Sequence, residues 1–227
     1  MTQQLQAAVE GQVLSSEFHA ASTSSTKGAV VIAYGSDGLT DHLNGPWATM
    51  IREYAQGLAP LGFHTLIPDY LGFTNTAPGM AALELIPYRR SQWEQALEAA
   101  ISLAGNQAGV HPSHVGLIGF SLGGHLCLRL RHQVQVLVSF FAPVLDGLGP
   151  SGSLRSAQIH HGTADKTPGT GFENAAAIEQ LLKVEGTTVE MHAYPGAGHG
   201  FKGSDLANQQ ARQLSMSRTL TFLTQQP

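Results

Sequence analysis

An apolar run, a tight glycine-bounded turn and a helical segment follow one another near the middle of the chain. Residues 115–118 are apolar, GFSLGG occupies residues 119–124, and residues 125–130 can form a helix. Gly-x-Ser-x-Gly between a strand and a helix is typical of a nucleophile elbow. A turn this tight leaves no room for a Cβ at Gly119 or Gly123. We therefore expect the Ser121 hydroxyl to stand above the end of a strand, beside the positive N-terminus of a helix.

Apolar runs bounded by Gly or Pro alternate with helical segments along most of the chain. Expected strands cover residues 28–34, 63–69, 115–120, 134–141, 157–161 and 189–194, with an edge strand at 13–20. Expected helices cover residues 46–58, 92–103, 172–184 and 205–222. This alternation predicts an α/β fold with a mostly parallel central sheet and helices on both faces. The 227 residues, 42% of them hydrophobic, suit a single domain spanning 1–227.

Two loops further along the chain carry an acid and a base. Asp165 follows the expected strand 157–161, and His199 follows the strand 189–194 within a Gly-rich loop. The order Ser, Asp, His is that of α/β-hydrolases. A serine hydroxyl needs an imidazole to take its proton, and the imidazole needs a carboxylate to fix its tautomer. Because the carboxyl ends of parallel strands share one edge of a sheet, we expect Ser121, Asp165 and His199 to converge.

An oxyanion hole is expected beside this group. The backbone N–H of Leu122 supplies its first half, at the start of the helix. The turn after the strand 28–34 supplies the second half through the N–H of Ser36, with Gly35 as the alternative.

Three other carboxylates and the single cysteine are candidates for these roles. Asp146, Asp37 and Asp69 are alternatives to Asp165 as the acid, and Asp146 ranks first among them. Asp37 is expected in a turn, and Asp69 is expected to cap the next loop. Cys127 has the setting of a buried small side chain rather than a nucleophile.

The remaining histidines fit structural roles. His160 and His161 are neighbours in a strand, so they face opposite sides of the sheet, and we interpret them as structural. His111 and His114 lack accompanying carboxylates or cysteines, so no metal site is predicted there.

Composition narrows the function classes. The net charge is −4 and only 12% of residues are charged, which gives no indication of nucleic acid or a membrane surface as partner. One cysteine excludes an intramolecular disulfide. The first eleven residues do not resemble a signal peptide, and no stretch approaches the ~18 apolar residues of a membrane span. We expect a cytoplasmic protein, monomer or homodimer, that needs no cofactor or metal.

Taken together, these motifs resemble those of the dienelactone hydrolase family. The likeness runs from about residue 28 to residue 222. It rests on the elbow, on Pro68-Asp69-Tyr70 followed by Ala77-Pro78-Gly79, on His161-Gly162 with Asp165, and on YPGAGHGF at residues 194–201. The short segment between the strand 134–141 and Asp165 also fits, because it leaves no room for a large cap domain. The resemblance implies an ester or lactone hydrolase of the α/β-hydrolase fold.

The chain departs from the best-known members in three places. Ser121 stands where they use a cysteine. Gly35 stands where they carry a glutamate that contacts the resting thiol. Asn75 and Gly203 stand where two arginines hold a substrate carboxylate. The resemblance therefore implies an ester, lactone or thioester hydrolase with a different, unassigned substrate.

Candidate substrate-binding residues surround the expected site, and Arg89 or Lys202 would suit an anionic substrate. They are Tyr34, Asp37, Tyr70, Phe73, Asn75, Tyr88, Phe120, Phe201 and Lys202.

The sequence thus predicts a small-molecule ester or lactone hydrolase that acts through an acyl-enzyme. Three alternatives stay open. The same three residues could serve an acyltransferase or lyase-type reaction, a peptidase could share the fold, or the chain could be a non-catalytic ligand-binding protein. Fold alone does not decide between them.

Overall fold

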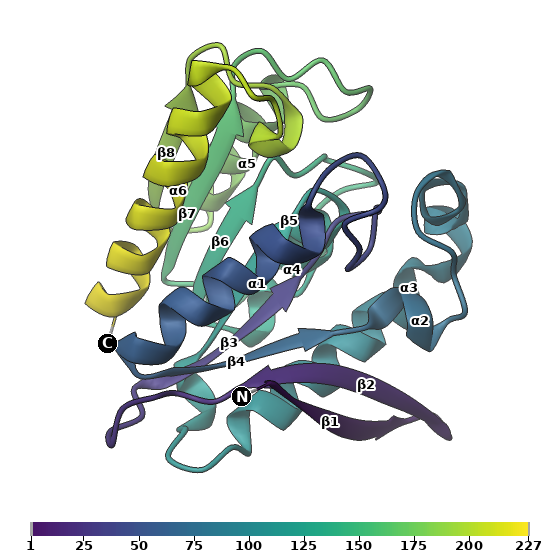
Figure 1. Ribbon diagram of the computed structural model, residues 1–227, viewed down its shortest axis with the longest axis vertical. Coiled ribbons are helices and arrows are strands. Elements are labelled where there is room, and N and C mark those ends of the chain that lie inside the picture. Colours follow the sequence, from purple (N-terminus) through teal and green to yellow (C-terminus); the bar gives the residue numbers. More distant parts are fainter. Residues whose placement is uncertain (1, 227) are drawn as a thin grey trace. The chain divides into compact units, whose positions relative to one another are not determined.

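The computed structural model describes residues 2–226 and contains one eight-stranded sheet, in the order β1-β2-β4-β3-β5-β6-β7-β8 (Figure 1). The strands are β1 (Thr2–Val9), β2 (Gln12–His19), β3 (Gly28–Ala33), β4 (Phe63–Pro68), β5 (Val115–Phe120), β6 (Val136–Phe140), β7 (Ser156–Gly162) and β8 (Thr188–Tyr194). The pairs β1–β2 and β2–β4 are antiparallel, whereas β3–β4, β6–β7 and β7–β8 are parallel. The predicted α/β class and mostly parallel sheet are confirmed.

The chain divides into two compact units, one ending at Leu117 and one beginning at Ile118. In the first unit, α1 (Trp47–Leu58) packs on β4, and α3 (Met80–Gly105) packs on β1, β3 and β4. The buried side of α1 repeats every three or four residues, from Trp47 through Ile51 and Tyr54 to Leu58, as an amphipathic helix requires. The short α2 (Tyr70–Phe73) follows β4, and 3₁₀ turns occupy Ala59–Leu61 and Pro112–His114. That the whole chain forms one domain stays a prediction.

Two sequence-based expectations for this unit were wrong. The strand expected at 13–20 is not an edge strand, because β1 pairs with β2 along its whole length and takes the edge itself. The helix expected at 92–103 begins at Met80, because Pro87 lies inside it without ending it. Proline removes the hydrogen bond to the carbonyl of Leu83, which lies one turn earlier on an exposed part of the helix.

In the second unit, α4 (Leu122–Arg129) packs on β6, while α5 (Glu173–Val184) and α6 (Leu206–Gln225) pack on β7 and β8. In Figure 1, α6 lies in front of these strands and α5 behind them. A 3₁₀ turn, Arg131–Gln133, precedes β6, and another, His199–Phe201, follows β8. Only residues 141–155 separate β6 from β7, so no cap domain is inserted there.

The side of β7 that faces α6 carries a buried polar cluster around His160. The Nε2–H of His160 donates to Oε1 of Gln158 at 2.8 Å, and Thr219 of α6 lies 3.2 Å from the same nitrogen. The Nδ1 of His160 therefore accepts from the Tyr194 hydroxyl, at 2.7 Å. The Gln158 amide donates to Glu190, at 2.9 Å, and lies 3.3 Å from His192. Burial lowers the pKa of His160 well below 6.5 and also lowers the pKa of His192, so both imidazoles stay neutral in the fold.

These neutral histidines predict a loss of stability on mild acidification. The pKa of His160 is lower in the folded chain than its unfolded value of 6.5. Below that pH the unfolded chain binds more protons, so the free energy of unfolding falls as pH falls, by about 1.4 kcal/mol per pH unit for His160. The lowered pKa of Glu17, about 2 because Arg52 donates to it, adds a separate loss only below 4.5. Denaturant titrations from pH 7.5 to about pH 5 measure the slope.

His160→Gln is expected to flatten that slope. The matched control is His42→Gln, since His42 is exposed. A slope that is the same in wild type, His160→Gln and His42→Gln would contradict the assignment.

Candidate active site

Ser121 occupies a strained turn between β5 and α4. Its backbone has φ 51° and ψ −116°, a region that residues with a side chain rarely adopt. A Cβ on Gly119 would lie 2.5 Å from the carbonyl oxygen of Gly123 and 2.6 Å from Cα of Gly124. The glycines of the motif are thus required by close backbone approach. The turn leaves the Ser121 side chain partly exposed at the N-cap of α4, while Leu122 behind it is buried.

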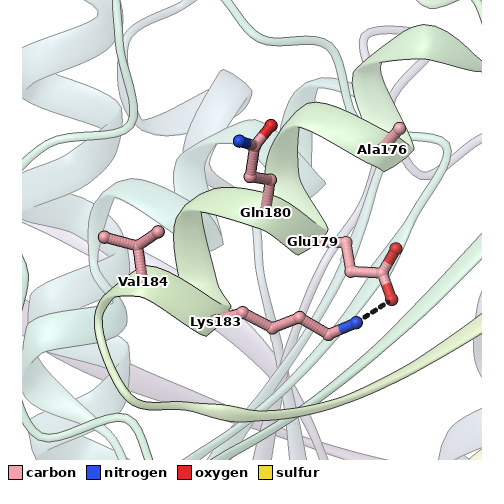
Figure 2. A pocket seen from close by; sticks show the side chains of 5 residues that line it. All are labelled: Ala176, Glu179, Gln180, Lys183 and Val184. Atoms are coloured by element: carbon pink, nitrogen blue, oxygen red, sulfur yellow. Dashed lines mark hydrogen bonds and ion pairs between the residues drawn. The ribbon is translucent and has the colours of Figure 1, made fainter.

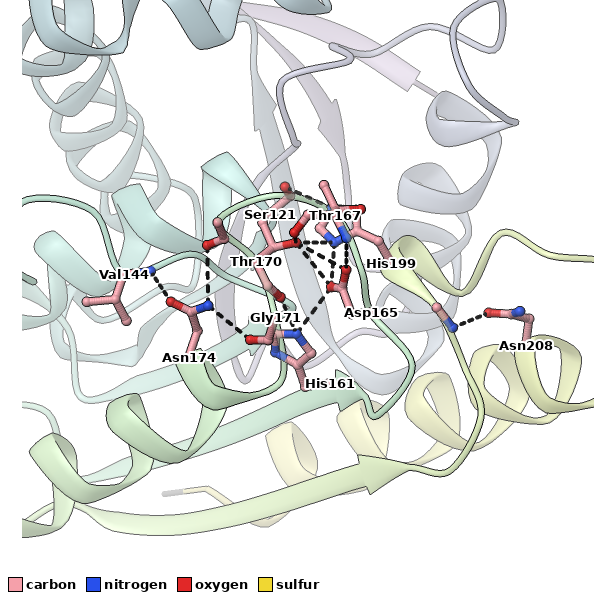
Figure 3. A network of polar contacts seen from close by, with 12 residues as sticks. Ser121, Val144, His161, Asp165, Thr167, Thr170, Gly171, Asn174, His199 and Asn208 are labelled. Atoms are coloured by element: carbon pink, nitrogen blue, oxygen red, sulfur yellow. Dashed lines mark hydrogen bonds and ion pairs between the residues drawn. The ribbon is translucent and has the colours of Figure 1, made fainter.

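Three side chains from separate loops form a chain of hydrogen bonds (Figure 3). The Nε2 of His199 lies 3.1 Å from the Oγ of Ser121, and its Nδ1 lies 2.7 Å from Oδ2 of Asp165. A carboxylate only accepts, so Nδ1 carries the proton and Nε2 is left to accept from the Ser121 hydroxyl. The Asp165 side chain is fully buried, whereas that of His199 is 13% exposed. The geometry lets His199 take a proton from Ser121.

Further donors hold the Asp165 carboxylate. The Thr167 N–H donates to Oδ1 at 3.0 Å, and the Thr170 hydroxyl lies 3.2 Å from Oδ1 and 3.3 Å from Oδ2. Burial alone would raise the pKa of Asp165, but the hydrogen bonds from His161 and His199 outweigh burial and hold the pKa well below its usual range. Asp165 is therefore a permanent anion at neutral pH, opposite the ring of His199.

The contacts of His161 and Thr170 in this network were not predicted from the sequence, which indicated only a structural role for His161. The Nε2–H of His161 donates to the carbonyl of Thr170, at 2.7 Å, and lies 3.2 Å from Oδ2 of Asp165. The Thr170 hydroxyl also lies 3.2 Å from Nδ1 of His199. The prediction that His160 and His161 face opposite sides was right, since His160 faces α6 and His161 meets the ring of Phe172 before α5. The four-residue spacing from His161 to Asp165 was the available signal.

The loop after β8 fixes the His199 ring. The Gly198 N–H donates to the side chain of Asn208, at 3.1 Å, which ties the loop to α6 (Figure 3). Phe141 packs edge-on against His199 with ring centroids 4.9 Å apart, and Phe201 packs on Phe141 at 5.3 Å. Phe201, a predicted pocket residue, is 2% exposed and packs on Phe141, the residue that contacts the imidazole.

Asn174 ties two further loops of the second unit together. Its side chain accepts from the Val144 N–H at 2.8 Å and donates to the Gly171 carbonyl at 2.9 Å (Figure 3). The segment after β6 is thereby fixed to the segment that carries Thr170. Asp146, the first alternative acid, lies in an exposed turn with φ 39°. The carboxylate that lies 2.7 Å from Nδ1 of His199 is that of Asp165.

The predicted residues of the first unit have the following positions. Tyr34 and Tyr70 are fully buried and stack at 4.5 Å, and the Tyr34 hydroxyl donates to Asp69 at 2.7 Å. Asp69 also accepts from the Gly72 N–H at 3.0 Å, so its predicted capping role is confirmed. The positions of Tyr34 and Tyr70 favour core packing over substrate contact.

The other predicted residues of the first unit are more accessible. Asp37, Ser36 and Gly35 form a half-buried turn in which the Gly35 carbonyl accepts from Gly38. Phe73 is half-buried, and Asn75 is exposed with φ 52°. Tyr88 is 77% exposed, and the neighbouring Arg89 donates a hydrogen bond to Gln92. Their roles, including the Ser36 or Gly35 N–H as an oxyanion donor, stay predictions.

The remaining candidates, Phe120, Lys202 and Cys127, lie in the second unit. Phe120 is buried and stacks on Phe140 at 4.6 Å, and Lys202 is exposed. Cys127 is fully buried in α4, and burial raises the pKa of its thiol. Within residues 2–226 no group of three or more metal-ligating side chains gathers.

A shallow hollow lies on the outer side of α5, apart from this network (Figure 2). Its walls are Ala176, Glu179, Gln180, Lys183 and Val184. Lys183 donates to Glu179 at 2.7 Å across it. The buried residues of α5 are Ala175, Ile178 and Leu182, so the hollow is on the helix side that faces away from the sheet. None of the hydrogen-bonded chain from Ser121 to Asp165 lines it.

Across residues 2–226, every helix is too short or too polar to pass through a lipid bilayer.

Comparison with known families matches residues 16–226 to the dienelactone hydrolase family. The chain belongs to this family of hydrolases, and the resemblance inferred from its motifs is confirmed.

Solved structures agree with that assignment. A dienelactone hydrolase-like promiscuous phosphotriesterase from metagenomic libraries matches at TM-score 0.76 and 21% identity, over 98% of each chain. A putative dienelactone hydrolase from Klebsiella pneumoniae subsp. pneumoniae matches at 0.75 and 15%, over 100% of this chain and 99% of that one. A propionate-bound thermophilic esterase from the planctomycete Thermogutta terrifontis matches at 0.71 and 19%, over 100% and 96%. These likenesses establish the α/β-hydrolase fold.

Proposed function

We propose that the protein is a serine hydrolase that cleaves a carboxylic ester or lactone. The observation that carries the proposal is the pair of contacts made by His199, 3.1 Å to the Ser121 hydroxyl and 2.7 Å to the Asp165 carboxylate. A serine beside an imidazole, with the imidazole oriented by a carboxylate, is the arrangement that activates a hydroxyl for acyl transfer.

The reaction follows from these positions. His199 Nε2 takes the Ser121 proton as Oγ bonds to the substrate carbonyl carbon, and the carbonyl oxygen becomes an oxyanion. The protonated His199 then gives that proton to the leaving alkoxide, which departs and leaves an acyl group on Ser121. Water repeats the cycle, with His199 as its base, and releases the carboxylic acid. Asp165 stays ionised and stabilises the imidazolium throughout.

The start of α4 suits the developing negative charge. Leu122 is the first residue of this helix, so its N–H has no acceptor within the helix. We assign it as an oxyanion donor, aided by the helix dipole.

The family assignment and an esterase among the similar structures support hydrolysis as the reaction. Acyl transfer or a lyase-type reaction on the same residues is the alternative. It would appear as partition of the acyl-enzyme toward an added alcohol or amine at the expense of water.

Covalent labelling tests the proposal. A serine-directed fluorophosphonate is expected to add once to the wild-type protein, as seen by mass spectrometry of the intact chain. Ser121→Ala should take no label. The matched control, Ser217→Ala, changes an exposed serine of α6 and should label like wild type. An adduct on Ser121→Ala would mean a different nucleophile, and no adduct on any of the three proteins would favour a ligand-binding protein.

A further inference from the structure

The strand β1 forms one open edge of the sheet, at the end of the strand order (Figure 1). Helix α3 packs on one side of it. On that side Gln3 is exposed, Leu5 and Ala7 are half-buried and Val9 is buried, whereas Gln4, Gln6 and Ala8 on the opposite side are exposed. The edge therefore has one mostly apolar side, from Leu5 to Val9, and one neutral, mostly polar side.

The hairpin turn determines which backbone groups point to this edge. Glu10 and Gly11 link β1 to β2 with φ 47° and 81°, the two positive values of a type I′ turn. Val9 and Gln12 flank that turn and are opposite each other, so they exchange both backbone hydrogen bonds. Hydrogen-bonded pairs alternate along an antiparallel ladder. Odd-numbered residues of β1 thus bond to β2, and even-numbered ones direct their N–H and C=O to the open edge.

The backbone hydrogen bonds on the other edge of β2, which faces β4, support this alternation. Gln6 is opposite Ser15, and by the alternation this pair forms no backbone hydrogen bonds within the hairpin. The Ser15 carbonyl accepts instead from the Asp69 N–H after β4, at 2.9 Å.

The edge lacks the features by which sheets avoid pairing with other strands. Edge strands are usually interrupted by charged residues, proline or a bulge. Residues 2–9 include no charged residue and no proline, and the eight pairs with β2 run in step without a bulge. The strand at the other end of the order, β8, differs because it carries Glu190 and His192.

We propose that β1 pairs antiparallel with β1 of a second copy of this chain, with Leu5 opposite Leu5 at the two-fold axis. Side chains share a side of the joined sheet only when residues of the same parity are opposite each other. With Leu5 at the axis, Gln4 is opposite Gln6, Thr2 is opposite Ala8, and each outward-directed residue from Thr2 to Ala8 has a backbone partner. A register centred on Gln6 leaves Thr2 unpaired.

A second copy is the occupant because the strand is self-complementary. It carries no charge that would repel itself or select an oppositely charged partner. The two leucines meet on the side next to α3, and the glutamine amides can bond to each other on the exposed side. An interface with the same patch on both chains closes as a dimer.

Charge substitutions at Gln4 and Gln6 test both the partner and the register. Sedimentation velocity of the full chain over a concentration series should give a species of twice the chain mass. Gln4→Lys with Gln6→Lys places like charges opposite each other and should weaken dimerisation roughly tenfold or more. Gln4→Lys with Gln6→Glu places opposite charges there and should restore the dimer.

Two controls separate dissociation from misfolding. Gln210→Lys with Gln213→Lys adds the same charge at exposed positions of α6 and should leave the dimer intact. Far-ultraviolet circular dichroism and melting temperatures check the fold. A lysine at position 4 does not repel β2, because the residue opposite it in β2 is Glu17. A monomeric wild type at the highest concentration reached, a dimer that persists with both lysines, or no restoration by the Lys–Glu variant would overturn the proposal.

Discussion

Ser121→Ala is expected to lower the turnover number for an ester such as p-nitrophenyl acetate by on the order of 10⁴–10⁶-fold. The alanine removes the hydroxyl oxygen that lies 3.1 Å from His199 Nε2, so no acyl-enzyme can form. KM for a slowly turned-over ester should change little, because the methyl group preserves the shape of the turn. Initial rates and the pre-steady-state burst measure the effect, and the burst should vanish.

Ser217→Ala provides the comparison for this kinetic experiment. It makes the same chemical change at an exposed position of α6, and we expect wild-type turnover and a full burst. Retention of more than a hundredth of the wild-type rate by Ser121→Ala, in protein with a normal melting temperature, would refute its role as nucleophile.

Asp165→Asn is expected to lower the turnover number by about 10⁴-fold while leaving the fold intact. The Oδ2 atom of Asp165 now accepts from Nδ1–H of His199 at 2.7 Å. An amide nitrogen in that position would instead donate to Nδ1, so the ring would carry its proton on Nε2. Nε2 could then no longer take the Ser121 proton. Steady-state kinetics above pH 7 measure the loss, since Asp165 is fully ionised there in the wild type.

Asp146→Asn is the matched control, because Asp146 was the first alternative acid in the sequence and occupies an exposed turn. Its turnover should stay within a factor of about two of wild type, as for most exposed positions. A large loss for Asp146→Asn with near-normal turnover for Asp165→Asn would exchange the two assignments.

Much of the fold could be predicted from local patterns. The buried strands β3 and β5 are apolar runs bounded by glycine, and that pattern does not depend on distant contacts. The strand β1 was not predicted, because it consists mainly of Gln and Ala. It is a strand through its pairing with β2 across a two-residue turn. The first turns of α3 escaped notice because Pro87 usually marks a helix end.

The candidate site likewise contains residues that local patterns predict and contacts that they do not. Ser121, Asp165 and His199 were predictable because each follows a strand that could be recognised by itself. The contacts of Thr170 were not, because its hydroxyl meets Asp165 and His199 only through the path of the loop between β7 and α5. The burial of Tyr34 and Tyr70 depends likewise on their mutual stacking, which no local pattern encodes.

The position of Cys127 bears on how the protein responds to oxidation by peroxide. Cysteine nucleophiles are lost stepwise to sulfenic, sulfinic and sulfonic acids, and the reaction begins with an accessible thiolate. Here the elbow carries the hydroxyl of Ser121, and the single thiol, that of Cys127 on α4, is buried in the core, which raises its pKa. Peroxide therefore meets no sulfur at residue 121 and no thiolate in the core, so neither of these two positions offers it a target.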